Sequence, residues 1–317
     1  MAVEAATPTQ VIGWLLSSTE PAIRRMTQRD LLDERPDDDE AAVLDGPLVR
    51  GLLAGQRADG GFGGGPYNKW TGAHWRLVSL VELEIPSGES RAVAALDTVL
   101  AWLAGAGHHR GVKIIAGLAR RCASQEGNAL AVASRLGRAS DERAGLLARN
   151  LVEWQWPDGG WNCDVRPEAH RSSFHESLPP VWGLHEYAIA TGDAGAAATA
   201  RRGAELFLEH RVYRTLKDGA PMSSEMATLH YPPYWHYDAG QALLILWRMG
   251  LAGDPRAADA VELLRRRRRP DGRWRPSTRW WSPPGSKRKE EAVDWGEFAS
   301  QMATLNALRI LRGAGDP

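Results

Sequence analysis

The sequence has few of the features that would place the protein in a membrane or in an oxidising compartment. Its 317 residues include two cysteines, Cys122 and Cys163, too few for a disulfide framework. No apolar run approaches the length of a membrane span, and the N-terminus lacks the basic and apolar regions of a signal peptide. We therefore expect a cytoplasmic protein without a transmembrane segment.

The sequence also lacks an excess of charge of either sign. Its 39 basic residues balance its 39 acidic residues, so the formal net charge is zero. A neutral chain has no global field that attracts polyanions, so we expect neither nucleic acid nor an anionic membrane as a partner.

Phenylalanine is scarce, with four copies, whereas tryptophan occurs 14 times. Most tryptophans stand beside glycine, proline or aspartate rather than inside apolar runs. Their positions therefore mark loops and helix starts.

A motif built on an Asp-Gly turn recurs along the chain. It reads GQRADGGF at 55–62, EWQWPDGGW at 153–161 and RRRPDGRW at 267–274, with a degenerate copy, KDGAP, at 217–221. With a further degenerate unit at 121–130, the spacing gives about five units of roughly 50 to 60 residues, a period typical of repeat architectures.

Each unit combines two kinds of helix. An amphipathic helix such as 141–154 precedes the turn, and a helix that is apolar on nearly all sides follows the loop. The apolar helices are expected at 75–83, 181–190, 239–249 and 298–311. Because a helix without a polar face must be surrounded, the alternation implies two layers.

The helix pattern predicts an all-α fold, since no segment shows convincing strand-like alternation. About six helix pairs, with an N-terminal pair at about 9–33 and repeats at about 40–312, can close into a double-layer barrel. We predict a single α/α toroid domain over residues 1–317.

The turn motif itself is expected to be structural. Its glycines are expected to take a positive φ that closes the preceding helix. Gln56 and Gln155 are expected to bond to the backbone at a neighbouring helix end. The aromatic residues after the glycines, Phe62 and Trp161, are expected to pack against the adjoining unit.

The Gln-x-x-Asp-Gly-Gly-aromatic repeats resemble those of the squalene cyclase and protein prenyltransferase β-subunit superfamily, over about residues 40–312. The chain is most similar to the short, single-toroid bacterial repeat proteins of that group, and the resemblance implies an α/α toroid. The Asp-x-Asp-Asp acid motif of class II terpene cyclases is missing from the inner-helix starts. The DDDE run at 37–40 is expected to be a cap and a solvated face.

In a toroid the N-termini of the inner helices meet at one end of the cavity, where functional groups are expected. His74, His175 and His236 occupy equivalent places there in three units. Asp238 is either an N-terminal cap or, in an aromatic cavity, a general acid with a raised pKa. In the leading hypothesis His236 and Asp238 form the acid/base pair, while His74 and His175 orient the substrate.

Aromatic residues near these helix starts are expected to enclose a small apolar or isoprenoid-like substrate, as in a terpene-cyclase-like cyclase, isomerase or lyase. Trp235 and Tyr237 are suited to stabilise a cationic intermediate through their π faces. The candidate substrate-binding residues are Trp70, Asn128, Trp161, Trp182, Tyr234, Trp235, Tyr237, Trp281, Trp295 and Glu297.

Two alternatives remain open at this point. One is a zinc-dependent transferase or hydrolase that uses His175, His236, Asp238 and Cys163 as ligands. Protein prenyltransferases hold zinc with Asp-x-Cys and a histidine; His236 matches that histidine, but no Asp-x-Cys precedes it, and Cys122 is assigned to the core. The other alternative is a non-catalytic toroid that binds a peptide or lipid. No obligatory partner chain is evident.

Overall fold

The computed structural model describes residues 7–277 and 279–316, which are mainly helical. The α-helices of this part are α1 (Pro8–Leu16), α2 (Pro21–Leu32), α3 (Pro47–Leu53), α4 (Ala73–Glu82), α5 (Ser90–Leu103), α6 (Ala106–His109), α7 (Ser124–Arg135), α8 (Glu142–Trp154), α9 (Phe174–Thr191), α10 (Ala194–Glu209), α11 (Ala239–Arg248), α12 (Ala258–Arg266) and α13 (Gly296–Gly313). Two 3-10 helices are η1 (Ala41–Asp45) and η2 (Pro255–Ala257). The predicted helical class is confirmed.

One short hairpin departs from the expectation that the chain has no strands. Strand β1 (Lys113–Ile115) pairs antiparallel with β2 (Leu118–Arg120). Ala116 and Gly117 form its turn with φ of 52° and 75°. Strands of three residues are too short to show an alternating pattern in the sequence.

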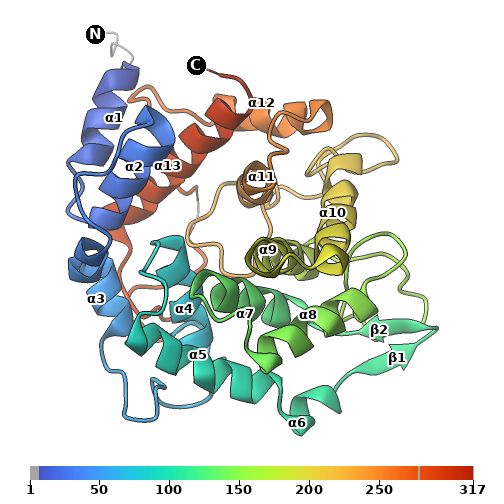
Figure 1. Cartoon of the computed structure of the whole chain (residues 1–317). Coiled ribbons are helices and arrows are strands. Elements are labelled where there is room, and N and C mark those ends of the chain that lie inside the picture. The colour runs from blue at the N-terminus through green and yellow to red at the C-terminus, as the bar shows by residue number, and fades with distance from the viewer. Residues whose placement is uncertain (1–6, 278, 317) are drawn as a thin grey trace.

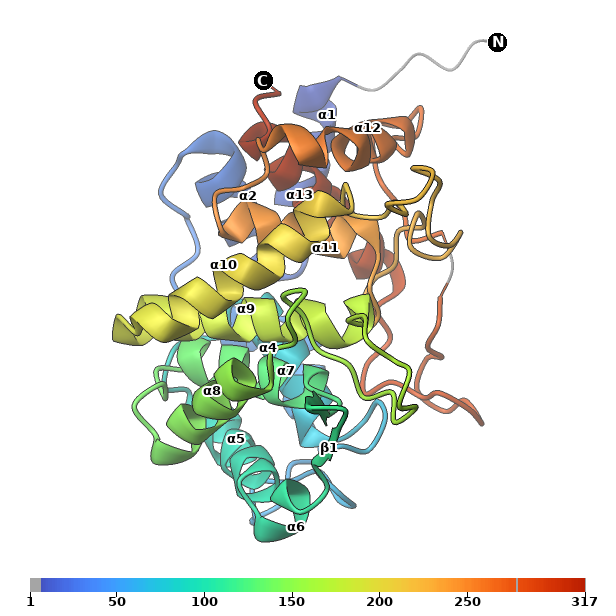
Figure 2. The same cartoon turned by 90° about the vertical axis from the view of Figure 1, so that its right-hand side faces the viewer.

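The helices separate into an inner and an outer set (Figure 1). Along the inner set, α4 packs on α7, α7 on α9, α9 on α11 and α11 on α13, and α13 packs on α2 near the start of the chain. The outer helices α5, α8, α10 and α12 each pack on an inner neighbour. Figure 2 shows the long helices α9 and α10 lying one against the other. The five expected helices at 75–83, 141–154, 181–190, 239–249 and 298–311 all have counterparts.

The tryptophans that follow two of the Asp-Gly turns, Trp161 and Trp274, connect the two layers. The indole N–H of Trp161 donates to the carbonyl of Leu151 in outer helix α8, at 2.9 Å, and its backbone N–H donates to the Ser177 hydroxyl in inner helix α9, also at 2.9 Å. Trp274 makes the same two hydrogen bonds: its indole N–H donates to outer helix α12 and its backbone N–H donates to inner helix α13. The expected structural role of Trp161 is thereby confirmed, and its expected role as a substrate contact is not supported.

The glutamine and glycine of the turn reach the next outer helix. Gln155 donates to the carbonyls of Gly159 and of Thr199 in α10, and Gln56 makes the same pair of bonds with Gly60 and with α5. Gly159 has a φ of 96°, and a Cβ there would lie 2.6 Å from the Arg202 carbonyl. The expected positive φ is confirmed, but the glycine does not close the helix: α8 ends at Trp154, and the glycine permits contact with α10.

In the described part of the chain, every helix is too short or too polar to cross a membrane.

Replacing Trp161 with alanine should lower the free energy of unfolding by about 3 to 5 kcal/mol, because a fully buried indole and its layer-bridging contacts are lost. Chemical denaturation followed by circular dichroism measures the loss. Val165→Ala, in the same loop but 52% exposed, is the control and should change stability by less than about 0.5 kcal/mol. Equal effects of the two substitutions would contradict the bridging role.

Candidate functional site

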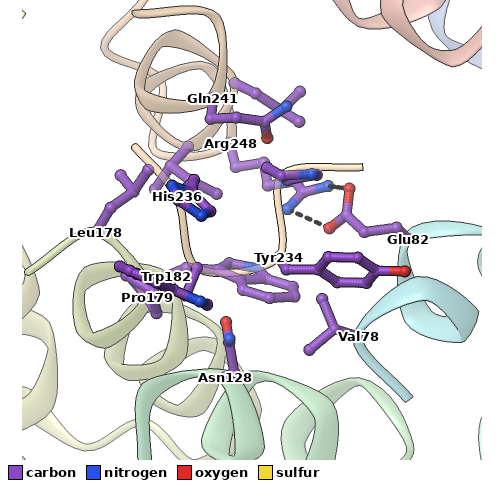
Figure 3. Close-up of a pocket in the computed structure, with 14 residues that line it drawn as sticks. Val78, Glu82, Asn128, Leu178, Pro179, Trp182, Tyr234, His236, Gln241 and Arg248 are labelled. Carbon is purple, nitrogen blue, oxygen red and sulfur yellow. Dashed lines mark hydrogen bonds and ion pairs between the residues drawn. The ribbon is translucent and has the colours of Figure 1, made fainter. Parts of the chain in front are cut away.

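A pocket lies between the inner helices α4, α7, α9 and α11, beneath the segment 233–236 (Figure 3). Its cavity volume is about 40 Å³, and its lining is mainly apolar with a few polar groups, a combination typical of small-molecule sites. The lining residues are Val78, Glu82, Asn128, Leu178, Pro179, Trp182, Pro233, Tyr234, Trp235, His236, Gln241, Leu244, Ile245 and Arg248.

The floor of the pocket is an ion pair between Glu82, at the end of α4, and Arg248, at the end of α11. Their charged atoms are 2.9 Å apart, and both side chains are about nine-tenths buried. Burial alone would raise the pKa of Glu82, but Arg248, together with the charges of Arg135 and Arg309, outweighs this effect and lowers the pKa below the usual value. Glu82 is therefore ionised at neutral pH and does not serve as a proton donor.

Further ion pairs join the C-terminal ends of the other inner helices around this floor. Arginines near helix C-termini are favoured by the helix dipole. The pairs are Arg135 with Glu186 at 3.2 Å, Arg29 with Glu84 at 2.7 Å, and Arg309 with Asp30. This charged end was not predicted from the sequence, although an arginine in or near the last turn of successive inner helices indicates it.

The roof of the pocket is formed by Trp235 and His236, which belong to a stack of alternating indole and imidazole rings that continues beyond the lining to Trp280 and His230. The ring centroids are 4.3 Å apart between Trp235 and His236, 3.8 Å between His236 and Trp280, and 3.5 Å between Trp280 and His230. Trp235 and His236 come from the segment before α11, and Trp280 comes from the segment before α13. The stack therefore joins two units over the pocket.

Of the three predicted histidines, His236 lines the pocket and His175 lies beside it. Their ring centroids are 5.7 Å apart, and His175 Nδ1 accepts the backbone N–H of Tyr237 at 2.9 Å. Burial, reinforced by nearby positive groups, lowers the pKa of His236 to about 3, and burial also lowers the pKa of His175. Both imidazoles are therefore neutral at pH 7, and His175 carries its proton on Nε2.

His74 lies outside the pocket lining. It is 1% exposed and packs edge-on against the rings of Tyr67, Trp75 and Trp102, where burial lowers its pKa to about 3. The expected role in orienting a substrate is not supported, because His74 is buried among aromatic side chains and does not line the cavity.

Asp238 does not pair with His236. Its Oδ1 accepts the backbone N–H of Gln241 at 3.0 Å and so caps α11, while its Oδ2 accepts from the backbone N–H and Nδ1 of His230 at 3.0 and 3.1 Å. The expected acid/base pair is therefore not formed. Of the two roles weighed for Asp238, its contacts support the N-terminal cap.

The predicted substrate-binding residues fall into three groups. Asn128, Trp182, Tyr234 and Trp235 line the pocket. Trp70 and Trp281 pack with Tyr234 in a separate aromatic cluster above it. The remaining residues lie elsewhere, since Trp161, Tyr237 and Trp295 belong to the main core and Glu297 accepts a hydrogen bond from Trp14.

Two hydrogen-bond donors on the pocket wall have no partner among the described residues. They are Nδ2 of Asn128, a residue only 1% exposed, and Nε1 of Trp235. Leaving a buried donor unpaired costs about 1 to 3 kcal/mol. The pocket is thus suited to a ligand that presents an acceptor such as a carbonyl, hydroxyl or carboxylate oxygen.

The expected zinc ligands do not form one group. Cys163 lies instead beside Cys122 and Glu176, whereas His175 and His236 belong to the pocket and Asp238 to the cap of α11. Cys122 is only partly buried, so its assignment to the core is not supported.

Comparisons of the chain with models of protein families, with curated proteins and with solved structures found no match.

Two contributions of Asp238 to stability can be measured separately: the cap of α11 and the buried hydrogen bonds to His230. Asp238→Ala should destabilise the protein by about 2 to 4 kcal/mol, because it removes the α11 cap and two hydrogen bonds to His230. Asp193→Ala, which removes only the cap of α10, should cost about 1 kcal/mol. Thermal or urea unfolding of both variants measures the difference, and equal losses would refute the buried contact.

Proposed function

We propose that the protein is an enzyme with a closed α/α toroid of about six helix pairs, related to the terpene cyclase and prenyltransferase β-subunit superfamily. The contact of α13 with α2 and the sequential packing of the inner helices support closure. The repeated bonds of Trp161 and Trp274 support a common repeat unit. The cytoplasmic location is part of this proposal and rests on the sequence alone.

The central pocket is the proposed active site, and its substrate is a small, largely apolar molecule with one hydrogen-bond acceptor. The observation that carries this proposal is the pair of unpartnered donors, Asn128 Nδ2 and Trp235 Nε1, on an otherwise apolar wall. One enclosed water needs roughly 10 to 15 Å³ of such a cavity. The 40 Å³ cavity therefore takes only a small group unless the Trp235–His236 roof moves.

The protonation states favour proton removal over proton donation. His236 is neutral and faces the pocket, whereas Glu82 is ionised and held by Arg248. A weak base is sufficient to deprotonate a carbocation, because such a proton is very acidic. The indoles of Trp235 and Trp182 would stabilise positive charge on the substrate before this step. We therefore favour a cyclase, isomerase or lyase whose substrate carries its own leaving group. Departure of that group with the bonding electrons leaves the cation, and His236 then accepts the proton whose loss forms the carbon–carbon double bond of the product.

Binding is tested first, with short-chain prenyl alcohols and ketones as probes and tryptophan fluorescence as the readout. Asn128→Leu should weaken probe binding about tenfold, because a hydrogen-bond donor is lost from the wall. Asn150→Leu is the matched control, since Asn150 is a buried residue of α8 whose Nδ2 also lacks a partner among the described residues, outside the pocket. Its probe binding should match wild type.

Catalysis is tested separately by His236→Phe, which keeps an aromatic ring in the stack. We expect probe binding to persist and product formation, followed by gas chromatography, to fall by at least about 100-fold, the lower range for loss of a general base. Binding without product in wild type would favour a non-catalytic binding protein. Binding that Asn128→Leu leaves unchanged would place the site elsewhere.

A further inference from the structure

Two cysteines and a buried glutamate converge where α7 and α9 begin. The Sγ atoms of Cys122 and Cys163 and a carboxylate oxygen of Glu176 all lie within 4.8 Å of one another, and Cys163 Sγ is 3.9 Å from Glu176 Oε1. Around a tetrahedral zinc ion, bonds of about 2.3 Å to sulfur and about 2.1 Å to oxygen place the ligand atoms roughly 3.5 to 3.8 Å apart. The ligand atoms of the three side chains therefore need to approach one another by about 1.3 Å at most.

The backbone holds the two cysteine-bearing segments side by side. Arg120 forms a parallel bridge with Asn162, and the backbone N–H of Arg121 donates to the Asn162 carbonyl at 3.0 Å. The residues that follow these partners in the chain are Cys122 and Cys163. The thiols are thus brought together by main-chain pairing, although 41 positions separate them in the sequence.

Glu176 is oriented independently of the cysteines. Its Oε2 accepts the backbone N–H of Ser124 at 3.1 Å, which leaves Oε1 beside Cys163. The Glu176 residue is only 8% exposed, so its carboxylate is held in place inside the protein. A donor atom fixed by a second contact is typical of metal ligands.

A second carboxylate makes the surroundings favourable for a cation. Glu126 is fully buried; its Oε1 accepts from Arg121 and lies 2.8 Å from His108 Nε2, while its Oε2 has no partner among the described residues. Glu126 lies in the first turn of α7, so a divalent cation bound at the starts of α7 and α9 would add positive charge near this buried carboxylate.

We propose that Cys122, Cys163 and Glu176 bind one zinc ion, with the fourth position open to water or to a substrate group. Two thiolates with a carboxylate suit zinc, whereas magnesium and calcium prefer oxygen ligands alone. Three protein ligands with one open position are typical of catalytic zinc sites. This site goes beyond the activity proposed for the central pocket and does not depend on it.

The test is a cobalt titration of the full-length protein, reduced and freed of metal by a chelator. We expect one equivalent of Co²⁺ to produce thiolate charge-transfer absorption in the near ultraviolet and the intense visible bands of a tetrahedral site. One equivalent of Zn²⁺ should displace it. Cys122→Ser and Cys163→Ser should each reduce the charge-transfer band. Glu176→Gln should keep the band but weaken binding by at least about tenfold.

Asp164→Asn is the matched control, because this carboxylate stands next to Cys163 but pairs with Arg166. Its titration should match wild type. Folding of each variant is checked by circular dichroism, and where a cysteine variant does not fold, the wild-type titration decides. A missing or six-coordinate cobalt spectrum in folded, reduced wild type overturns the proposal, as does binding that Glu176→Gln leaves unchanged. Because no substrate is involved, this outcome is separate from that of the Asn128 variants.

Discussion

The arrangement of the two helix layers depends on contacts made at the Asp-Gly turns, most completely at the turn of residues 155–161. One turn touches three helices: the tryptophan bonds back to the preceding outer helix and across to an inner helix, while the glutamine and glycine reach the following outer helix. Gly159 permits this approach because it has no side chain to meet the Arg202 carbonyl. The turn at 155–161 thus spans two layers and two units, and parts of the same set of contacts recur at Gln56 and Trp274.

The two ends of the inner helices carry different kinds of side chain. Their C-terminal ends meet in ion pairs such as Glu82 with Arg248, in which opposite charges are buried and paired. Their N-terminal ends carry capping groups and aromatic rings, as at Asp238 and His236. The pocket lies between a charged floor and an aromatic roof, so a bound molecule would meet apolar walls with polar groups only at set positions.

Burial keeps the imidazole of the pocket uncharged at neutral pH. His236 is stacked between two indoles without a carboxylate partner, and its pKa is accordingly low. Asp238, the nearest acid in the sequence, instead faces His230. Positive charge in this pocket would therefore be stabilised by π faces rather than by an anion, while the cysteine and glutamate donors are gathered at the neighbouring starts of α7 and α9.

The sequence by itself determined the helical class, the placement of the inner helices and the structural role of the turns, because these depend on local periodicity and on glycine and tryptophan within one repeat. Trp182, Tyr234, Trp235, His236 and Asn128 were also identified, since position in a unit indicates nearness to the cavity. Only the tertiary structure decided which side chains meet. Asp238 contacts His230 and not His236, because its role as the cap of α11 orients its side chain. Cys122 lies beside Cys163 and Glu176, because main-chain pairing brings together segments that are distant in the sequence.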